Sequence, residues 1–505
     1  MAQPMALVAD ANTQFAPAGP ARAMPAEERQ GLALRALAGT FTITQLADDA
    51  GVSRKFVYQQ VSVAQEALDE AFTPETPDDR VLGELRVTKA WLRQVVLSLL
   101  LSCHAPYRGI IDHFVACLNQ SISLGTIYNI VHDAVAQARV YNEQQSLANV
   151  RVGLLDEIFQ NGQPVLVGID AHSTYCFLLS AEDNREGVTW GVRLLEAQDR
   201  GLAPASFVAD FGSGLRNGLA LAMPDTPCWG DVFHGLYTVQ PVATALEKAA
   251  YEALNRCDRL ERQAAEYQRR HGRANFSFAQ KLRNARPAAD QAIAVADDVA
   301  LLARWLRDDV LALAGPCLAE RQTVYDFLVA ELRARAPQCP YRLHPLCTFL
   351  DNQRASLLAF AGQLDRDLAQ LAANVQVRVA TVRDLLSLQA LGDASPRRAP
   401  READLRRRLR DRFYALSRAV AAVAERIVRA SSAVENLNSR LRTYFTLRRE
   451  IGSDYLTLLQ FYLNHRRFPR SERPERVGKR PAELLTGQKH PHWLELLGYQ
   501  PFSRN

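Results

Sequence analysis

The sequence predicts an α/β domain with a mixed five-stranded sheet, interrupted by a large all-α insertion and preceded by two small helical domains. Three observations lead to this fold class. Strand-like segments are confined to residues 150–239, helical periodicity dominates residues 240–430, and an amphipathic helix with further helices follows at 431–487. The chain of 505 residues is long enough for roughly two to four domains.

The composition is that of an ordinary globular protein, with 48% hydrophobic and 23% charged residues. The net charge of +5 permits a nucleic-acid partner without requiring one. The eight cysteines contain no CxxC pair, which argues against a zinc ribbon and a disulfide framework. The longest apolar run, 95–101, is too short to span a membrane, and the start of the chain lacks the order of a signal peptide. We therefore expect a cytoplasmic protein without a membrane partner.

The order of helix, turn and helix in the N-terminal region predicts a first helix-turn-helix domain at 26–72. It follows an Ala- and Pro-rich leader at 1–25 that we expect to be disordered. A helix at about 27–38 precedes Thr44, a candidate N-cap, and a second helix begins after Gly51. A plain helical hairpin with a polar face is the alternative. In a helix-turn-helix domain, the start of the last helix would present a set of polar side chains to a DNA groove: Ser53, Arg54, Lys55 and either Tyr58 or Gln59.

A second unit at 81–147 repeats this plan after a Pro- and acid-rich linker at 73–80. A helix runs to about Ser102, a short helix follows Pro106, and a long helix begins near Leu124. Two such units in tandem indicate a protein that reads an extended DNA site. The residues of the long helix that we expect to contact DNA are Thr126, Tyr128 and Asn129.

The segment 150–239 predicts three antiparallel strands followed by helix, strand, helix and strand. Asn161-Gly162 supplies the turn of a hairpin, which a third strand at 174–182 extends. A helix at 187–200 leads to a strand at 206–211, and after a helix that begins with glycines the last strand covers 227–234. This order is that of a ribonuclease-H-like fold, in which the first and fourth strands lie side by side and parallel.

Carboxylates occur at strand positions that this topology brings together. Asp210 closes the fourth strand, where functional residues of open sheets usually lie, and Asp156 lies in the first strand. Asp170 is the alternative to Asp156. The hairpin, however, pairs Asp170 with about residue 153, away from Asp210, so we favour Asp156. Glu157 should point to the opposite face of the sheet.

Neighbouring carboxylates repel one another, and a common reason for their coexistence is a hard divalent cation such as Mg²⁺ or Mn²⁺. A two-metal site for phosphoryl transfer requires a third acid. In the helix SSAVENLNSRLRTYF (431–445), Val434 lies at the centre of an apolar stripe and Glu435 at its border. A helix that packs this stripe on the sheet would therefore hold Glu435 beside the site, with Asn438 and Arg442 positioned to contact phosphate.

Taken in order, these elements resemble the DDE-type transposases of bacterial insertion sequences. The resemblance rests on LLDEIF…GQPVLVGID, FVADFGSGLRNGL, the strand ending DVFH, and SSAVENLNSRLRTYF…LTLLQFYLNHRRF…VGKRPAELLTG. It covers about residues 150–487, with 240–430 as an insertion domain that divides the ribonuclease-H-like core into 150–239 and 431–487. It implies that Asp156, Asp210 and Glu435 bind two Mg²⁺ or Mn²⁺ ions and carry the catalysis.

The resemblance further implies binding to double-stranded DNA, both at terminal inverted repeats and at the target, and assembly of a homo-oligomer on DNA in a bacterial nucleoid. Some branches with an insertion carry a Cys/His pair after the fifth strand. Cys228 and His234 lie there with a different spacing, so a core role for His234 is the favoured interpretation.

Downstream of Glu435, arginines alternate with aromatic residues, which indicates a track for the DNA backbone that includes Arg466 and Arg467. Residues 488–505 form a C-terminal tail. Two alternative functions stand beside the transposase: a catalytically silent DNA-binding regulator derived from one, and a ribonuclease-H-like nuclease.

Overall fold

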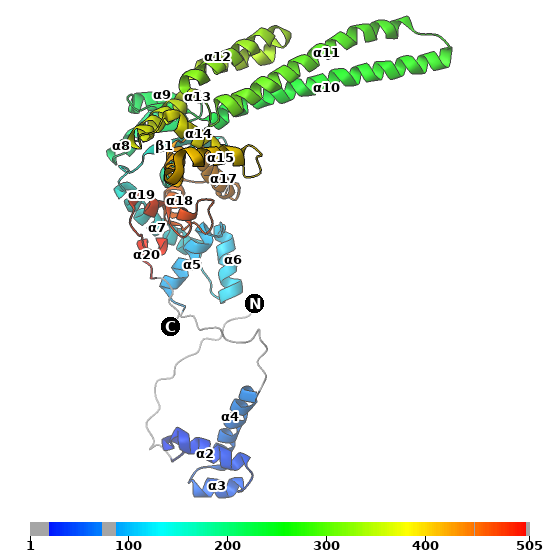
Figure 1. Ribbon diagram of the computed structural model, residues 1–505. Coiled ribbons are helices and arrows are strands. Elements are labelled where there is room, and N and C mark those ends of the chain that lie inside the picture. Colours follow the sequence, from blue (N-terminus) through cyan, green and yellow to red (C-terminus); the bar gives the residue numbers. More distant parts are fainter. Residues whose placement is uncertain (1–19, 73–86, 449, 501–505) are drawn as a thin grey trace. The chain divides into compact units, whose positions relative to one another are not determined.

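The computed structural model describes residues 20–72, 87–448 and 450–500, and the chain forms two compact units, one up to Arg86 and one from Val87 to Ser503 (Figure 1). Most of the predicted leader and the whole predicted linker, residues 1–19 and 73–80, lie outside the described residues. The described part of the leader contains the short helix α1 (Pro20–Ala23).

The N-terminal unit contains the helices α2 (Ala26–Leu37), α3 (Ile43–Asp49) and α4 (Arg54–Phe72) around a small apolar core. Ser53 caps α4, since its Oγ accepts a hydrogen bond from Phe56 N at 3.2 Å. The prediction of Thr44 as the cap of α3 is wrong. Thr42 is the N-cap, because its side chain and that of Gln45 each bond the other's backbone N–H in a capping box.

The second unit contains a five-stranded sheet of order β3-β2-β1-β4-β5. β1 pairs antiparallel with β2 and parallel with β4, and β5 extends the parallel side. The predicted turn joins β1 to β2, with Asn161 and Gly162 both at positive φ. The mixed sheet with a helical insertion is thus as predicted. The bounds of the strands are β1 (Val152–Gln160), β2 (Gln163–Asp170), β3 (Cys176–Ala181), β4 (Ser206–Ala209) and β5 (Cys228–Gly230).

The fifth strand is shorter than predicted. It ends at Gly230, and the residues to His234 that were expected to continue it belong instead to the helix α10 (Val232–His271). The reason is Asp231, whose carboxylate accepts hydrogen bonds from the N–H groups of Phe233 and His234 and so begins a helix.

Both faces of the sheet are covered by helices, which makes three layers. One face, with Leu154, Ile158 and Val167, packs against α5 (Lys89–Leu101), α7 (Leu124–Gln144), α17 (Ser432–Thr446) and α18 (Ser453–His465). The other face, with Leu155 and Phe207, packs against α8 (Gly187–Asp199) and α9 (Ser213–Ala222). The alternation along β1 therefore decides on which side of the sheet each polar residue emerges.

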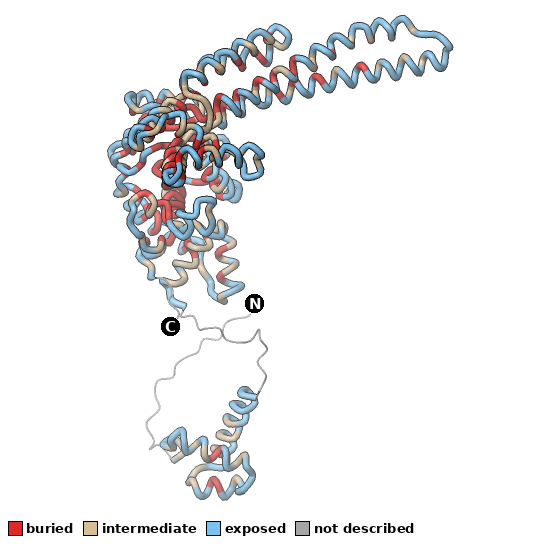
Figure 2. Tube along the Cα trace, viewed as in Figure 1, coloured by how far each residue is buried: buried red, intermediate tan, exposed pale blue. Residues whose placement is uncertain are grey.

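The helical insertion follows β5 directly and has a core of its own. Its first two helices, α10 and α11, form a long hairpin that extends away from the sheet, with burial concentrated toward its base (Figures 1 and 2). No strand occurs between 240 and 430 in this fully described stretch. α11 covers Phe276–Trp305. The remaining helices of the insertion are η1 (Leu306–Val310), α12 (Leu318–Arg335), η2 (Ala336–Gln338), α13 (Pro340–Asn374), α14 (Val379–Ala390), α15 (Arg398–Leu409), η3 (Arg410–Arg412) and α16 (Phe413–Arg426).

The chain then returns to the sheet through α17 and α18. Short helices close the unit, and Trp493 in the last of them is buried against Tyr462 of α18.

In the described part of the chain, no helix combines the length and the apolar character that crossing a membrane requires. The short elements are α6 (Tyr107–Leu118), η4 (Pro474–Arg476), α19 (Pro481–Thr486) and α20 (Trp493–Leu496).

Candidate active site

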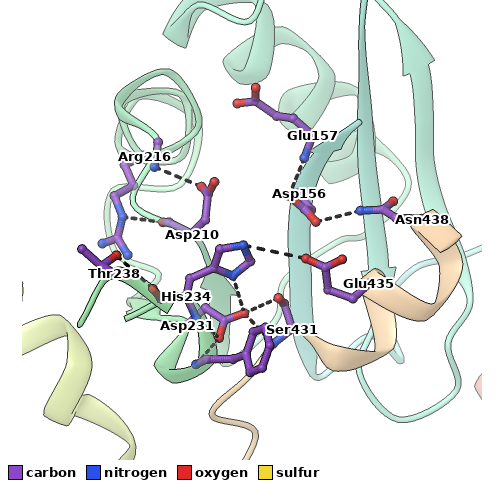
Figure 3. A network of polar contacts seen from close by, with 12 residues as sticks. Asp156, Glu157, Asp210, Arg216, Asp231, His234, Thr238, Ser431, Glu435 and Asn438 are labelled. Atoms are coloured by element: carbon purple, nitrogen blue, oxygen red, sulfur yellow. Dashed lines mark hydrogen bonds and ion pairs between the residues drawn. The ribbon is translucent and has the colours of Figure 1, made fainter. Parts of the chain in front are cut away.

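Asp156 and Asp210 face the same site because their strands are parallel neighbours. The last paired residues of β1 and β4 are Leu155 and Ala209, and each aspartate is the next residue along its chain. Side chains alternate along β1, so Asp156 points to the same side as Leu154 and Ile158, which is the sheet face that α17 covers. Figure 3 shows the two carboxylates on opposite sides of one opening.

Glu435 reaches this opening from the first turn of α17. Val434, which was predicted at the centre of the apolar stripe, is buried together with Leu437 and Leu441, and these residues pack on the sheet. Glu435 is half-buried at the border of the stripe and points toward Asp156 (Figure 3). Three carboxylates from β1, the end of β4 and α17 thus converge at one place, although Glu435 lies more than 200 positions after either aspartate.

Asn438, one helical turn after Glu435, fixes the orientation of Asp156. It is buried, and its Nδ2 donates a hydrogen bond of 2.7 Å to Asp156 Oδ2 (Figure 3). This amide nitrogen was expected to contact a phosphate of DNA, but in the structure it binds a carboxylate inside the protein. Its role is therefore to position Asp156.

The charge of Asp156 is unfavourable in this environment. The residue is 8% exposed. Burial, reinforced by the charges of Glu435 and Asp210, raises the pKa of Asp156 to about 7, although a hydrogen bond from the backbone of Glu157 opposes the shift. A carboxylate with such a pKa would gain from a nearby cation.

His234 and Asp231 complete the site, and sequence reasoning missed Asp231 altogether. His234 Nδ1 lies 3.1 Å from Asp231 Oδ2, and its Nε2 lies 3.7 Å from Glu435 Oε1 (Figure 3). The hydrogen bond to Asp231 raises the pKa of His234 to about 9 against the effect of burial, and the charges of Asp231, Asp156 and Asp210 add to the shift. His234 is therefore an imidazolium at neutral pH.

Asp231 also joins the two helices that border the site. It is fully buried, caps the N-terminus of α10, and accepts hydrogen bonds from the N–H and the hydroxyl of Ser431 at the start of α17. These hydrogen bonds and that of His234 hold the pKa of Asp231 below its usual value, although burial opposes ionisation. The sequence did carry a signal for this role. Asp231 stands between a short strand and a helical segment, and Asp is a preferred N-cap residue.

Asp170, the alternative first acid, lies elsewhere. It pairs with Gly153 in the β1–β2 ladder, as predicted, and its carboxylate serves the turn that follows β2. That carboxylate accepts hydrogen bonds from His172 N at 3.2 Å, from Ser173 N at 2.7 Å and from Ser173 Oγ at 2.6 Å. The structure therefore places Asp156, and not Asp170, with Asp210 and Glu435.

Two neighbouring residues have other roles than the carboxylates. Glu157 points to the opposite face of β1, as expected, and forms an ion pair of 2.9 Å with Arg185. Cys228 does not pair with His234, because it packs on the face covered by α8 and α9 while His234 turns toward Asp231. A third neighbour, Gly214 in the first turn of α9, has a packing role, since a Cβ there would lie 2.0 Å from Arg185 O.

The remaining predicted DNA-contacting residues are spread over several elements. The polar set at the start of α4 is exposed, as are the predicted residues of α7, and Tyr58 is 61% exposed. Arg442 of α17 is exposed on the side of the helix that carries Glu435, Arg467 is exposed after α18, and Arg466 stacks on Tyr462. Of these residues, only Arg442 belongs to the element that carries Glu435.

The oxygen donors of the site suit Mg²⁺ or Mn²⁺ in kind, since all three acids are carboxylates. Their positions differ from those of a formed metal centre, because no group of three or more His, Cys, Asp and Glu side chains among the described residues is arranged to hold an ion. Burial and the neighbouring charges of Glu435 and Asp210 disfavour the ionised form of Asp156, and a cation at this place would offset that penalty. Asp156, Asp210 and Glu435 are the residues that would hold it.

No protein-family model and no curated protein matches this chain. The function must therefore be argued from the arrangement of the site.

Proposed function

We propose that this protein is a DNA transposase that cleaves DNA at the ends of a mobile element and transfers the freed strand, with a ribonuclease-H-like core. The observation that carries the proposal is the convergence of Asp156, Asp210 and Glu435 from two parallel strands and a distant helix, together with the raised pKa of Asp156. The strand order β3-β2-β1-β4-β5, with β1 and β4 parallel, supports the assignment of the core.

In this proposal the three carboxylates hold two Mg²⁺ or Mn²⁺ ions, which when bound stabilise the entering and leaving oxygens of an in-line phosphoryl transfer. Asn438 holds Asp156 in the orientation seen here. His234, kept protonated by Asp231, places a positive charge 3.7 Å from Glu435 and lowers the repulsion among the carboxylates.

The N-terminal helices and α7 would bind double-stranded DNA at the terminal inverted repeats, through exposed polar and basic residues at the starts of α4 and α7. A homo-oligomer would bring two element ends together, and the basic residues Arg442, Arg466 and Arg467 would contact the DNA backbone. This partner assignment places the protein at the bacterial nucleoid.

The proposal is tested with the full-length protein and a duplex that carries the DNA flanking its gene. We expect Mn²⁺-dependent strand cleavage by the wild-type protein, abolished in Asp210→Asn and Glu435→Gln while duplex binding persists. Asp225→Asn, an exposed aspartate after α9, is the matched control and should cleave normally. Cleavage that survives both substitutions would disprove the assigned site.

A second readout does not depend on cleavage. Mn²⁺ should raise the melting temperature of the wild-type protein but not that of Asp156→Asn, since binding to the folded state alone stabilises it. A wild-type protein that binds element ends and Mn²⁺ without cleaving would favour the silent regulator. Cleavage of structured nucleic acid without preference for inverted repeats would favour the nuclease.

A further inference from the structure

A large cavity lies on the flank of α17 that faces away from the carboxylates. Its volume is about 1030 Å³, above the range of roughly 300–1,000 Å³ typical of small-molecule pockets. Ser432, Asn436 and Arg440, spaced four residues apart on one side of α17, line it. Glu435 and Asn438 lie on the other side of the same helix, at the active site. One helix thus separates two sites, and the proposed function uses only one of them.

Among the charged residues that line the cavity, arginines outnumber carboxylates by five to two. Its carboxylates are Glu425 and Glu472, and neither forms an ion pair with the arginines of the lining in the described part of the chain. This differs from the helical insertion, where Arg354 and Arg383 are paired with aspartates. The unpaired arginines come from the loop before α17, from α17 itself and from the segment after α18: Arg429, Arg440, Arg470, Arg473 and Arg476.

Several of these guanidinium groups are unfavourably placed without an anion. Burial lowers the pKa of Arg440, and the neighbouring charge of Arg466 adds to this effect. The Nε of Arg440 is buried and has no hydrogen-bond partner among the described residues. Burial likewise lowers the pKa of Arg476, whose side chain donates to the backbone oxygens of Ala171 and His172. Phosphate oxygens are the acceptors that arginine prefers in such a place.

Two aromatic rings lie among these cations. Phe468 lines the cavity between α18 and the arginine segment, and Phe233 lines it from the first turn of α10. Phe233 is 56% exposed and directly precedes His234 of the active site. Phe468 is half-buried. Arginines that contact the phosphate backbone, together with accessible aromatic rings on which bases can stack, are typical of sites for single-stranded nucleic acid. A duplex would not offer its base faces to these rings.

We infer that this cavity binds a single-stranded segment of DNA, with phosphates on the arginines and bases on Phe233 and Phe468. Because the cavity adjoins the first residues of both helices that border the active site, the segment would be the strand that continues from the reacting phosphodiester. This inference rests on the proposed function for the identity of the strand, whereas the binding itself requires no cleavage.

The test measures binding of a fluorescent single-stranded oligonucleotide of unrelated sequence to the full-length protein, in EDTA and over a range of salt concentrations. Arg470 and Arg473 are exposed, so their joint replacement should leave the fold intact. Arg470→Ala/Arg473→Ala should weaken binding roughly tenfold and reduce the slope of log K against log salt by about 1.4, since two phosphate contacts are lost. Phe233→Ala should also weaken binding about tenfold but leave the salt slope unchanged.

The matched control is Arg418→Ala, which removes an exposed charge from α16 outside the cavity and should bind like the wild type. A double variant that binds the single strand with wild-type affinity and salt slope overturns the inference. Competition by inorganic phosphate or a nucleoside triphosphate as effective as that by the oligonucleotide also overturns it, because the cavity would then be a site for a free phosphate compound.

The failure of this inference and that of the proposed function are distinguishable. If the wild-type protein does not cleave element ends but binds the single strand through Arg470 and Arg473, the proposed function fails and the cavity assignment stands. If it cleaves, and Arg470→Ala/Arg473→Ala binds the single strand as the wild type does, the cavity assignment fails alone.

Discussion

Two buried aspartates of the hairpin β1–β2 differ in how their charge is compensated. Asp170 is 2% exposed and accepts hydrogen bonds from the backbone and hydroxyl groups of the turn that follows it. Asp156 is 8% exposed, receives one hydrogen bond from Asn438 and one from Glu157 N, and shares its surroundings with Glu435 and Asp210. The first arrangement stabilises the fold, whereas the second leaves negative charge that a ligand can neutralise. Burial of an acid alone therefore does not identify a functional site.

The largest expected effect comes from Asp156→Asn. The amide keeps the shape of the side chain but removes the charge, so Mn²⁺-dependent cleavage should fall about 10³-fold or more. The free energy of unfolding in EDTA should stay the same or increase, because a buried and repelled carboxylate is lost. Single-turnover cleavage and urea unfolding measure the two effects. A variant that cleaves at the wild-type rate would remove Asp156 from the site.

The opposite result is expected for Asp170→Ala. Several N–H and hydroxyl donors of the turn lose their acceptor, so the free energy of unfolding should fall by about 2–4 kcal/mol. Cleavage per folded molecule should persist below the melting temperature. If the folded variant instead lost cleavage while keeping its stability, Asp170 would belong to the active site and the structural role assigned to it would be wrong.

The pH dependence of stability should reveal the raised pKa of Asp156. Because the pKa of Asp156 is about 7 in the folded protein and near 3.9 when unfolded, its contribution to stability is fully present below about pH 4. That contribution is lost as the pH rises to 7, by at most about 4 kcal/mol in the metal-free protein. Unfolding measured from pH 4 to 8 in EDTA should show this decline, and Asp156→Asn should flatten it. Identical profiles for the two proteins would contradict the raised pKa.

The smallest effect is expected for Ser431→Ala, which removes one of the two donors that Ser431 offers to Asp231. The backbone N–H at 2.8 Å remains, so the free energy of unfolding should fall by only about 1 kcal/mol. Cleavage should slow modestly, since the start of α17 carries Glu435. Ser439→Ala, an exposed serine of the same helix, is the control and should change neither quantity.

Local sequence patterns predicted the elements on which the site is built. The Asn161-Gly162 turn, the alternation along β1 and the apolar stripe of α17 follow from rules that act over a few residues. For the same reason, Asp156 and Glu435 could be chosen before the structure was known. The wrong predictions were also local. The N-cap of α3 is Thr42 rather than Thr44, and the fifth strand ends before the predicted residue because Asp231 begins α10.

The contacts of the site could not be predicted in this way. Asn438 was expected to face DNA but binds Asp156, because the distance between α17 and β1 depends on how the buried stripe packs. Asp231 and Ser431 lie 200 positions apart and meet only because the insertion begins and ends beside the sheet. Their hydrogen bond links the two boundaries of the insertion.

The sequence by itself determined which residues could be acids at strand ends, which face each helix would bury and where the helical insertion interrupts the sheet domain, since periodicity and turn chemistry are local. Only the tertiary structure decided that Asn438 binds Asp156, that His234 lies between Asp231 and Glu435, and that unpaired arginines gather on the far flank of α17. The physical reason is that burial and electrostatic interactions depend on distances in space, and residues hundreds of positions apart supply them.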